Sequence, residues 1–300
     1  MPKHPRPHAL LWAVAVLVGI SALGACGSSS PTSSTSSTHS PTTVSTTVAV
    51  PTSGATTTTR GAVATRAVRI YLVRGETLAV TRRTIAADAP PATAALDALL
   101  RGPVTSDGGM ITAIPAGTRA HGVSVVGGTA TADLTRTFES GGGSLSMRNR
   151  IAEVVYTLTQ FPTVQRVAFR IDGTPVTAIG GEGLIVDPPR TRADFTDALP
   201  NILVETPTVG SLVVPPLVVQ GMSDVFEAVV QFRVRDAHGA ELVHQRAMAT
   251  AGTGTWGTFS TTLRFSPTTT TGTLEVYAIS MKDGSEIDKQ IVPLTFFVRS

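Results

Sequence analysis

The chain has 300 residues, of which 42% are hydrophobic and 15% are charged, enough apolar material for one or two folded domains. Its formal net charge is +3 and its isoelectric point is near 9.4, but the arginines are scattered and only 5% of the residues are aromatic. This pattern argues against nucleic-acid binding. The single cysteine, Cys26, excludes a disulfide within the chain.

Residues 1–25 have the three parts of an export signal: a short basic head with Lys3 and Arg6, an apolar stretch over 9–20, and small residues before Cys26. The tetrapeptide Leu23-Gly24-Ala25-Cys26 resembles a bacterial lipobox. This resemblance implies cleavage before Cys26 and attachment of diacylglycerol to its thiol. Two or three acyl chains, such as palmitate, would hold the mature protein on the extracytoplasmic face of the cell membrane.

Two other interpretations of this segment are open. Cys26 could be an ordinary buried cysteine, although the glycine and serines that follow it cannot build a core. The apolar run over 9–25 could instead be an uncleaved membrane anchor. It lies at the short end of the roughly 17 to 25 residues that span a bilayer, and no basic cluster follows it. Either kind of anchor places the body of the protein outside the cytoplasm.

Residues 26–66 are predicted to form a disordered tether. No Asp, Glu, Lys or Arg occurs between Arg6 and Arg60, and residues 28–59 are mostly Ser, Thr, Pro and small residues. Such a segment cannot bury enough apolar surface to offset the entropy of an ordered chain. As a random coil of about 40 residues, it would hold the first domain about 35 Å from its attachment point on average.

Residues 67–187 combine predicted strands with two predicted helices. The first helix is expected to have Asp88 as its N-cap and to stop at Gly102-Pro103; the second runs from about Ser146 to Thr159 and carries apolar residues at i, i+3, i+4 and i+7. Alternating apolar and polar residues predict strands over 68–73, 78–85, 111–114, 123–126, 129–134 and 164–171. The mixture predicts a two-layer α+β domain.

The pattern breaks down over 188–200, which we interpret as a linker. Residues 201–299 then contain only strand signals separated by turn residues, over 202–205, 217–220, 228–236, 241–249, 257–265, 273–280 and 290–298. Seven short strands without a helix predict an all-β immunoglobulin-like sandwich. Its core must be stabilised by side-chain packing without a disulfide, because the paired cysteines of antibody domains are absent.

Several motifs occur in the order and spacing of two known domains. The first set is Arg83, Leu99 to Pro103, Ile114 to Thr118, Ala132 to Leu134, Tyr156 to Pro162 and Ile171 to Gly173. With these, residues 67–187 resemble the GerMN domain. The second set is Pro207 to Gly210, Pro216, Gly221, Phe226-Glu227, Asp236 to Gly239, Trp256 to Phe259 and Asp283-Gly284. With these, residues 201–299 resemble the immunoglobulin-like Gmad2 domain. One departure from the GerMN pattern is the insertion Gly141-Gly142-Gly143.

The resemblance implies an envelope lipoprotein of actinobacterial type, similar to the accessory proteins of sporulation, germination or the envelope. It attaches no enzymatic activity and no cofactor to either domain. Most of the matching motifs have architectural explanations as helix ends and turns. Arg83 and Asp133 could form an ion pair within the domain or make surface contacts.

The residues themselves show no catalytic constellation. The predicted domains hold three histidines, of which His238 and His244 would need a third ligand to bind a metal ion and His121 stands alone. Gly141-Gly142-Gly143 lacks the lysine of a phosphate-binding loop. Any pair of carboxylates chosen from Glu139, Glu153 and Glu182 would be arbitrary. We therefore expect neither an enzyme nor a metal or cofactor site.

The sequence is compatible with three functions. The leading hypothesis is association with envelope proteins, or self-association, through edge strands of the sandwich or through the GerMN sheet. The alternative is a module that binds peptidoglycan or another wall glycan, for which Trp256 and Tyr277 could supply stacking faces. A hydrolase is the third, and nothing in the sequence supports it.

Overall fold

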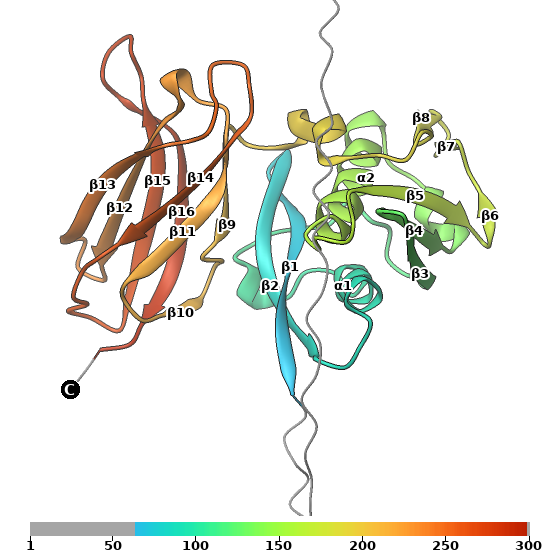
Figure 1. Ribbon diagram of the computed structural model, residues 1–300, viewed down its shortest axis with the longest axis horizontal. Helices are drawn as coiled ribbons and strands as arrows, with labels where there is room; N and C mark the ends of the chain where they lie inside the picture. The colour runs from blue at the N-terminus through green and yellow to red at the C-terminus, as the bar shows by residue number, and fades with distance from the viewer. Residues whose placement is uncertain (1–63, 299–300) are drawn as a thin grey trace, which may run out of the picture. The chain divides into compact units, whose positions relative to one another are not determined.

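The computed structural model describes residues 64–298, and the predicted signal peptide, lipobox and most of the tether lie outside the described residues. The described residues contain two hydrophobic cores. Figure 1 shows a first part with helices and strands and a second part built of strands. None of the described helices is long and apolar enough to cross a membrane.

A long hairpin opens the first domain. Strands β1 (Thr65–Arg74) and β2 (Thr77–Ala86) pair antiparallel along their whole length around the predicted turn at Gly75. Helix α1 (Pro91–Leu100) follows, and the prediction that Asp88 caps it is wrong, because the N-cap is Pro90. A residue that precedes a proline is kept out of the helical region, so the helix begins at Pro91, too far along the chain for the Asp88 side chain to cap it.

A four-stranded sheet forms the second layer of this domain. Its order is β3-β4-β5-β6, with bounds Ala120–Val126, Thr129–Leu134, Arg166–Ile171 and Thr174–Pro175. The hairpin predicted around Gly127-Gly128 joins β3 to β4. Helix α2 (Ser144–Leu158) connects β4 to β5, which are parallel. The strand predicted over 111–114 is wrong: this segment makes a single bridge, between Ile111 and Val73.

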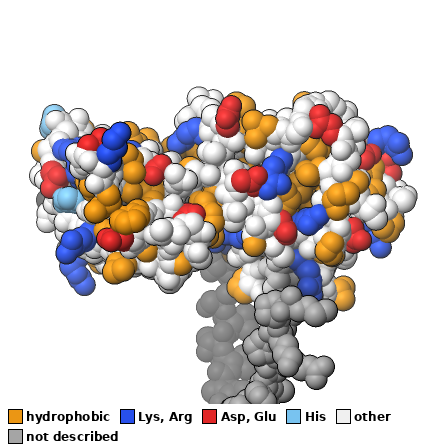
Figure 2. All heavy atoms as spheres, turned by 90° about the horizontal axis from the view of Figure 1, so that it is seen from above, with side chains coloured by type: hydrophobic (Ala, Val, Ile, Leu, Met, Phe, Trp, Pro, Cys, Tyr) orange, Lys and Arg blue, Asp and Glu red, His pale blue; other side chains and the backbone are white. Residues whose placement is uncertain are grey.

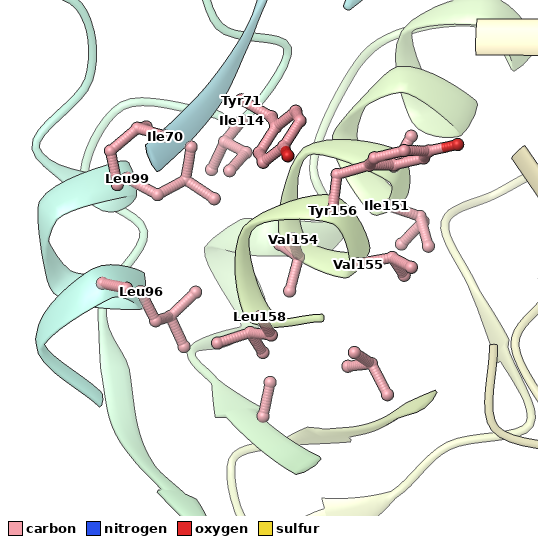
Figure 3. Packing of buried hydrophobic residues seen from close by; sticks show 14 of the residues in the cluster. Ile70, Tyr71, Leu96, Leu99, Ile114, Ile151, Val154, Val155, Tyr156 and Leu158 are labelled. Carbon is pink, nitrogen blue, oxygen red and sulfur yellow. The ribbon is translucent and has the colours of Figure 1, made fainter. Parts of the chain in front are cut away.

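Short elements fill the connections. They are η1 (Thr105–Asp107), η2 (Arg136–Glu139), the paired strands β7 (Ala178–Ile179) and β8 (Leu184–Ile185), and η3 (Arg192–Ala198), which lies inside the predicted linker. Helix α2 occupies the centre of the first core and is buried over most of its length. Figure 3 shows Leu96 and Leu99 of α1 on the side that faces Val154 and Leu158 of α2. The apolar periodicity of both helices thus marks where they pack.

The second domain is a β-sandwich. One sheet has the order β10-β16-β15-β12-β13 and the other β14-β11-β9. Their bounds are β9 Ile202–Thr206, β10 Ser211–Val213, β11 Leu217–Ser223, β12 Val229–Asp236, β13 Glu241–Met248, β14 Gly257–Leu263, β15 Thr271–Ile279 and β16 Glu286–Phe296, with η4 (Phe226–Ala228) before β12. All seven predicted strands form. The sequence pattern missed β10, which has three residues and pairs parallel with β16. The fold class is therefore α+β followed by an all-β sandwich, as predicted.

Candidate functional site

A pocket of about 450 Å³ lies where the first turns of α2, the β7–β8 hairpin and η3 meet. Its wall combines four charged side chains, Arg148, Glu182, Arg190 and Asp194, with apolar side chains that include Met147 and Phe195. In size and composition it could hold a small ligand. Whether it could do chemistry depends on what its charged groups already bind.

The charged groups of this pocket are paired with one another and with nearby backbone. Arg190 Nη1 lies 3.6 Å from Asp194 Oδ1, and Arg148 forms an ion pair with Asp197 and donates to the Asp194 carbonyl at 2.7 Å. Burial would raise the pKa of the Asp194 carboxyl, but hydrogen bonds from the Thr191 backbone and hydroxyl, with Arg190 nearby, lower it below its usual value. The Asp194 carboxyl is therefore not poised as a general acid near neutral pH.

Two charged residues of α2 are buried in the first core. Arg150 donates to the carbonyls of Ala113 (3.0 Å), Phe138 (2.5 Å) and Gly141 (3.1 Å). Glu153 accepts hydrogen bonds from the Thr112 hydroxyl (2.6 Å) and the Ala113 N–H (2.7 Å). Burial raises the pKa of Glu153 to about 8. These bonds satisfy backbone groups of two loops, and they explain why 111–114 does not pair as a strand.

Arg83 also has a structural partner. Its Nη1 and Nη2 donate to the buried carboxylate of Asp107 at 2.8 and 2.5 Å, and Asp107 further accepts from the Thr81 hydroxyl and the Val104 N–H. The carboxylate therefore ties η1 to β2. Asp133, the other residue considered for an ion pair, accepts a hydrogen bond from the Gly173 N–H at 2.9 Å. Both motif residues thus serve the architecture.

A third polar cluster joins β1, α2, η3 and β9. Arg192 donates to Glu205 Oε1 at 2.8 Å and to the Tyr71 hydroxyl at 3.0 Å, and Tyr71 donates to Glu205. The guanidinium also lies over the rings of Tyr71 and Tyr156. Leu203, from β9 of the sandwich, is buried in the first core. The two domains therefore share polar and apolar contacts.

The outer face of the five-stranded sheet carries a fourth cluster. Arg233 forms ion pairs with Glu275 and Glu286, and Lys289 pairs with both carboxylates. The Tyr277 ring lies between Arg233 and Lys289, which cover it to 2% exposure. Tyr277 is therefore no stacking face for a sugar, contrary to the expectation for a glycan-binding module. Trp256 is partly buried against the first core.

The predicted histidines and carboxylates do not converge. His121 lies 3.2 Å from Asp172, and His244 contacts the Tyr277 hydroxyl at 3.2 Å while His238 sits in the β12–β13 turn. Within residues 64–298 no group of three potential metal ligands occurs. Glu153 is buried in the core, whereas Glu182 contacts the Ser144 hydroxyl. The lipobox residues Leu23, Gly24, Ala25 and Cys26 lie outside the described residues.

Sequence reasoning missed the residues that organise these clusters. The burial of Arg150 could have been predicted from the sequence, because it shares the apolar face of α2 with Met147, Ile151 and Val154. Asp107, Arg192 and Glu205 had no such signal, since the side chains that they bind lie more than ten residues away along the chain. On the face drawn in Figure 2, acidic and basic side chains are interspersed.

Comparisons with known proteins identify both domains. Residues 69–177 match the Germane family, described as "Sporulation and spore germination", and residues 201–285 match Gmad2, described as "Immunoglobulin-like domain of bacterial spore germination". No curated protein matches the chain.

Solved structures with similarity to the chain include two of the sporulation protein GerM from Bacillus subtilis. Its tandem GerMN domains are 18% identical with a TM-score of 0.40, over 67% of this chain and 62% of that one. Its first GerMN domain is 26% identical with a TM-score of 0.36, over 43% of this chain and 99% of that one. The family matches and the two-domain architecture agree: the chain carries a Germane domain followed by an immunoglobulin-like Gmad2 domain.

Proposed function

We propose that this protein is a lipid-anchored, non-catalytic accessory protein of the cell envelope, which acts by associating with other proteins outside the cytoplasmic membrane. One observation carries the non-catalytic part of the proposal. Four ionisable side chains of the first domain, the buried Arg150, Glu153 and Asp107 and the partly buried Arg192, bind this chain's own backbone and side chains. These groups therefore hold loops and strands together.

We propose that both domains act by association with other proteins. The two family descriptions refer to sporulation and spore germination, and neither names a reaction. Sheet edges and exposed apolar side chains offer contact surfaces of the kind that bind extended protein segments. By analogy with these families, we infer an accessory role in an envelope assembly of the sporulation or germination type.

The anchor rests on the sequence alone. Leu23, Gly24 and Ala25 precede Cys26 after an apolar run, as in a lipobox, and a charge-poor segment separates Cys26 from the first domain. Lipid on Cys26 would place both domains on the extracytoplasmic face of the membrane. The glycan-binding alternative loses support, since one of its two candidate aromatic residues is buried.

Anchoring is tested by the mass of the mature protein. The expected N-terminus is Cys26 carrying acyl chains, and Cys26→Ser should release the protein from the membrane fraction while Ser28→Ala should not. An intact Met1 would overturn the lipoprotein proposal. Association is tested by cross-linking in intact cells: reproducible cross-links to envelope proteins or to a second copy are expected, and a strictly solitary protein would overturn it.

A further inference from the structure

We propose that the free edge of β3 in the Germane domain binds an extended, acidic segment of a partner protein as an added strand. This inference rests on the proposed function and deepens it by naming the surface and the chemistry of the partner. The strand is the outermost of the sheet β3-β4-β5-β6 and pairs only with β4. The opposite side of the sheet is covered at β5 by β6 and by a bridge from Arg190 to Val167.

The backbone of β3 presents unused hydrogen-bonding groups. A two-residue turn at Gly127-Gly128 makes Val126 and Thr129 a hydrogen-bonded pair, and the antiparallel alternation then assigns the next such pair to Ser124 and Thr131. The N–H and C=O groups of Val123 and Val125 consequently point away from β4. Among the described residues, no backbone hydrogen bond from outside this sheet reaches them. Two consecutive docking points for an added strand are therefore available.

The side chains of β3 lack the usual protection of an edge. Between Gly122 and Val126 the strand carries no charge and no proline, and Val125 and Val126 are 40% and 77% exposed. By contrast, the edge strand β13 of the sandwich carries the ionisable residues Glu241, His244 and Arg246.

The charged side chains beside β3 indicate the charge of the partner segment. A hollow of about 350 Å³ between the end of α1 and the start of β3 is lined by Arg101 and Arg119 and one carboxylate, Asp97. A second hollow, of about 290 Å³, is lined by residues of β3 and β4, among them His121 and the carboxylate-bearing Asp133, together with Arg170 of β5. None of these three arginines forms an ion pair within residues 64–298. Alternate side chains of an added strand point to opposite faces, so acidic residues on the face of the first hollow would meet Arg101 and Arg119, and those on the other face would lie on the side of Arg170 and Asp133.

The test uses the full chain in detergent micelles and a labelled nine-residue peptide. The peptide has central valines flanked by glutamates, so that acidic side chains fall on both faces, and its counterpart carries lysine in place of glutamate. We expect the acidic peptide to bind and to slow hydrogen exchange at the amides of Val123 and Val125, and the lysine peptide to bind at least about tenfold more weakly. Equal binding of both peptides, or none, overturns the proposal.

Two variants locate the site. Val125→Pro removes an N–H that faces away from β4, where proline is tolerated in an edge strand, and should weaken peptide binding about tenfold or more. Reversing Arg101, Arg119 and Arg170 to glutamate should do the same while leaving the backbone groups of β3 unchanged. The matched control reverses three other exposed arginines, Arg82, Arg246 and Arg264, and should change binding by no more than about twofold at physiological salt.

The remaining outcomes separate this inference from the proposed function. Binding that survives Val125→Pro and the Arg101, Arg119 and Arg170 reversals overturns the edge site. Protection of Val123 and Val125 that grows with protein concentration in the absence of peptide would assign the edge to a second copy of the chain and overturn the acidic partner. If cross-links form in cells but the acidic peptide does not bind, the proposed function stands and this inference falls. If the peptide binds but wild-type cells show no cross-links, the proposed function falls.

Discussion

The stability of the Germane domain should depend on pH through Glu153, whose carboxyl group lies in the core with no exposed surface. Burial is the largest influence on its pKa and raises it from 4.5 to about 8, against the lowering effect of Thr112, the Ala113 N–H and Arg150. The unfolded chain has no such burial, so its carboxyl titrates near the ordinary value. Folding therefore favours proton uptake at this residue.

The sign and size of the effect follow from linkage. A pKa that is raised on folding contributes stability that is fully present below pH 4.5 and is lost as the pH rises toward 8. The interval between these two values corresponds to at most about 5 kcal/mol of unfolding free energy. Glutamine has nearly the same shape and never ionises, so Glu153→Gln should remove this contribution.

The assay is urea unfolding of the wild type and Glu153→Gln at about pH 5, 7 and 9. The unfolding free energy of the wild type, relative to that of Glu153→Gln, should fall by several kcal/mol between the lowest and the highest pH. Glu76→Gln, at an exposed turn position, is the matched control and should show no such trend. A wild-type-to-Glu153→Gln difference that is constant, or that grows with pH, would refute the reasoning.

Three further predictions concern the other contacts. Asp107→Ala leaves Arg83 and the Val104 N–H without their acceptor and should lower the unfolding free energy by about 3 kcal/mol in urea titrations; a loss below about 1 kcal/mol would contradict the assigned role. Gly221→Ala would place a Cβ 2.1 Å from the Leu203 carbonyl oxygen and should lower Tm, whereas Gly181→Ala has open space and should not; equal Tm values would contradict the close packing. Arg192→Lys cannot reproduce the two-pronged contact with Glu205 and Tyr71, and faster hydrogen exchange in β9 is expected, with unchanged exchange as the contrary result.

Local signals predicted much of the fold. The Gly75 and Gly127-Gly128 turns and the alternation in β12 depend on neighbouring residues only, and each formed where expected. Helix α2 was recognisable because its apolar residues repeat with the helical period. These elements needed no knowledge of the rest of the chain.

The errors arose where distant residues decide the structure. Segment 111–114 has strand-like residues, but Glu153 and Arg150 of α2 take the backbone groups that a strand would need. The three-residue strand β10 is stabilised by pairing with β16, about eighty residues later, and has too little pattern of its own. Tyr277 was read as a possible binding face, yet Arg233 and Lys289 cover its ring.

The two domain types and most of their strands could be predicted from the sequence alone, since composition, turn residues and apolar period act over a few neighbouring positions. The anchor at Cys26 stays a prediction from the same kind of local signal. Which charged residues bind within the chain, and which edge of the sheet β3-β4-β5-β6 is open, could be seen only in the folded structure. The buried carboxylates of Asp107 and Glu153 acquire their partners when strands and helices separated in sequence pack together. Unused backbone groups on β3 likewise become recognisable only when the order of the strands is known.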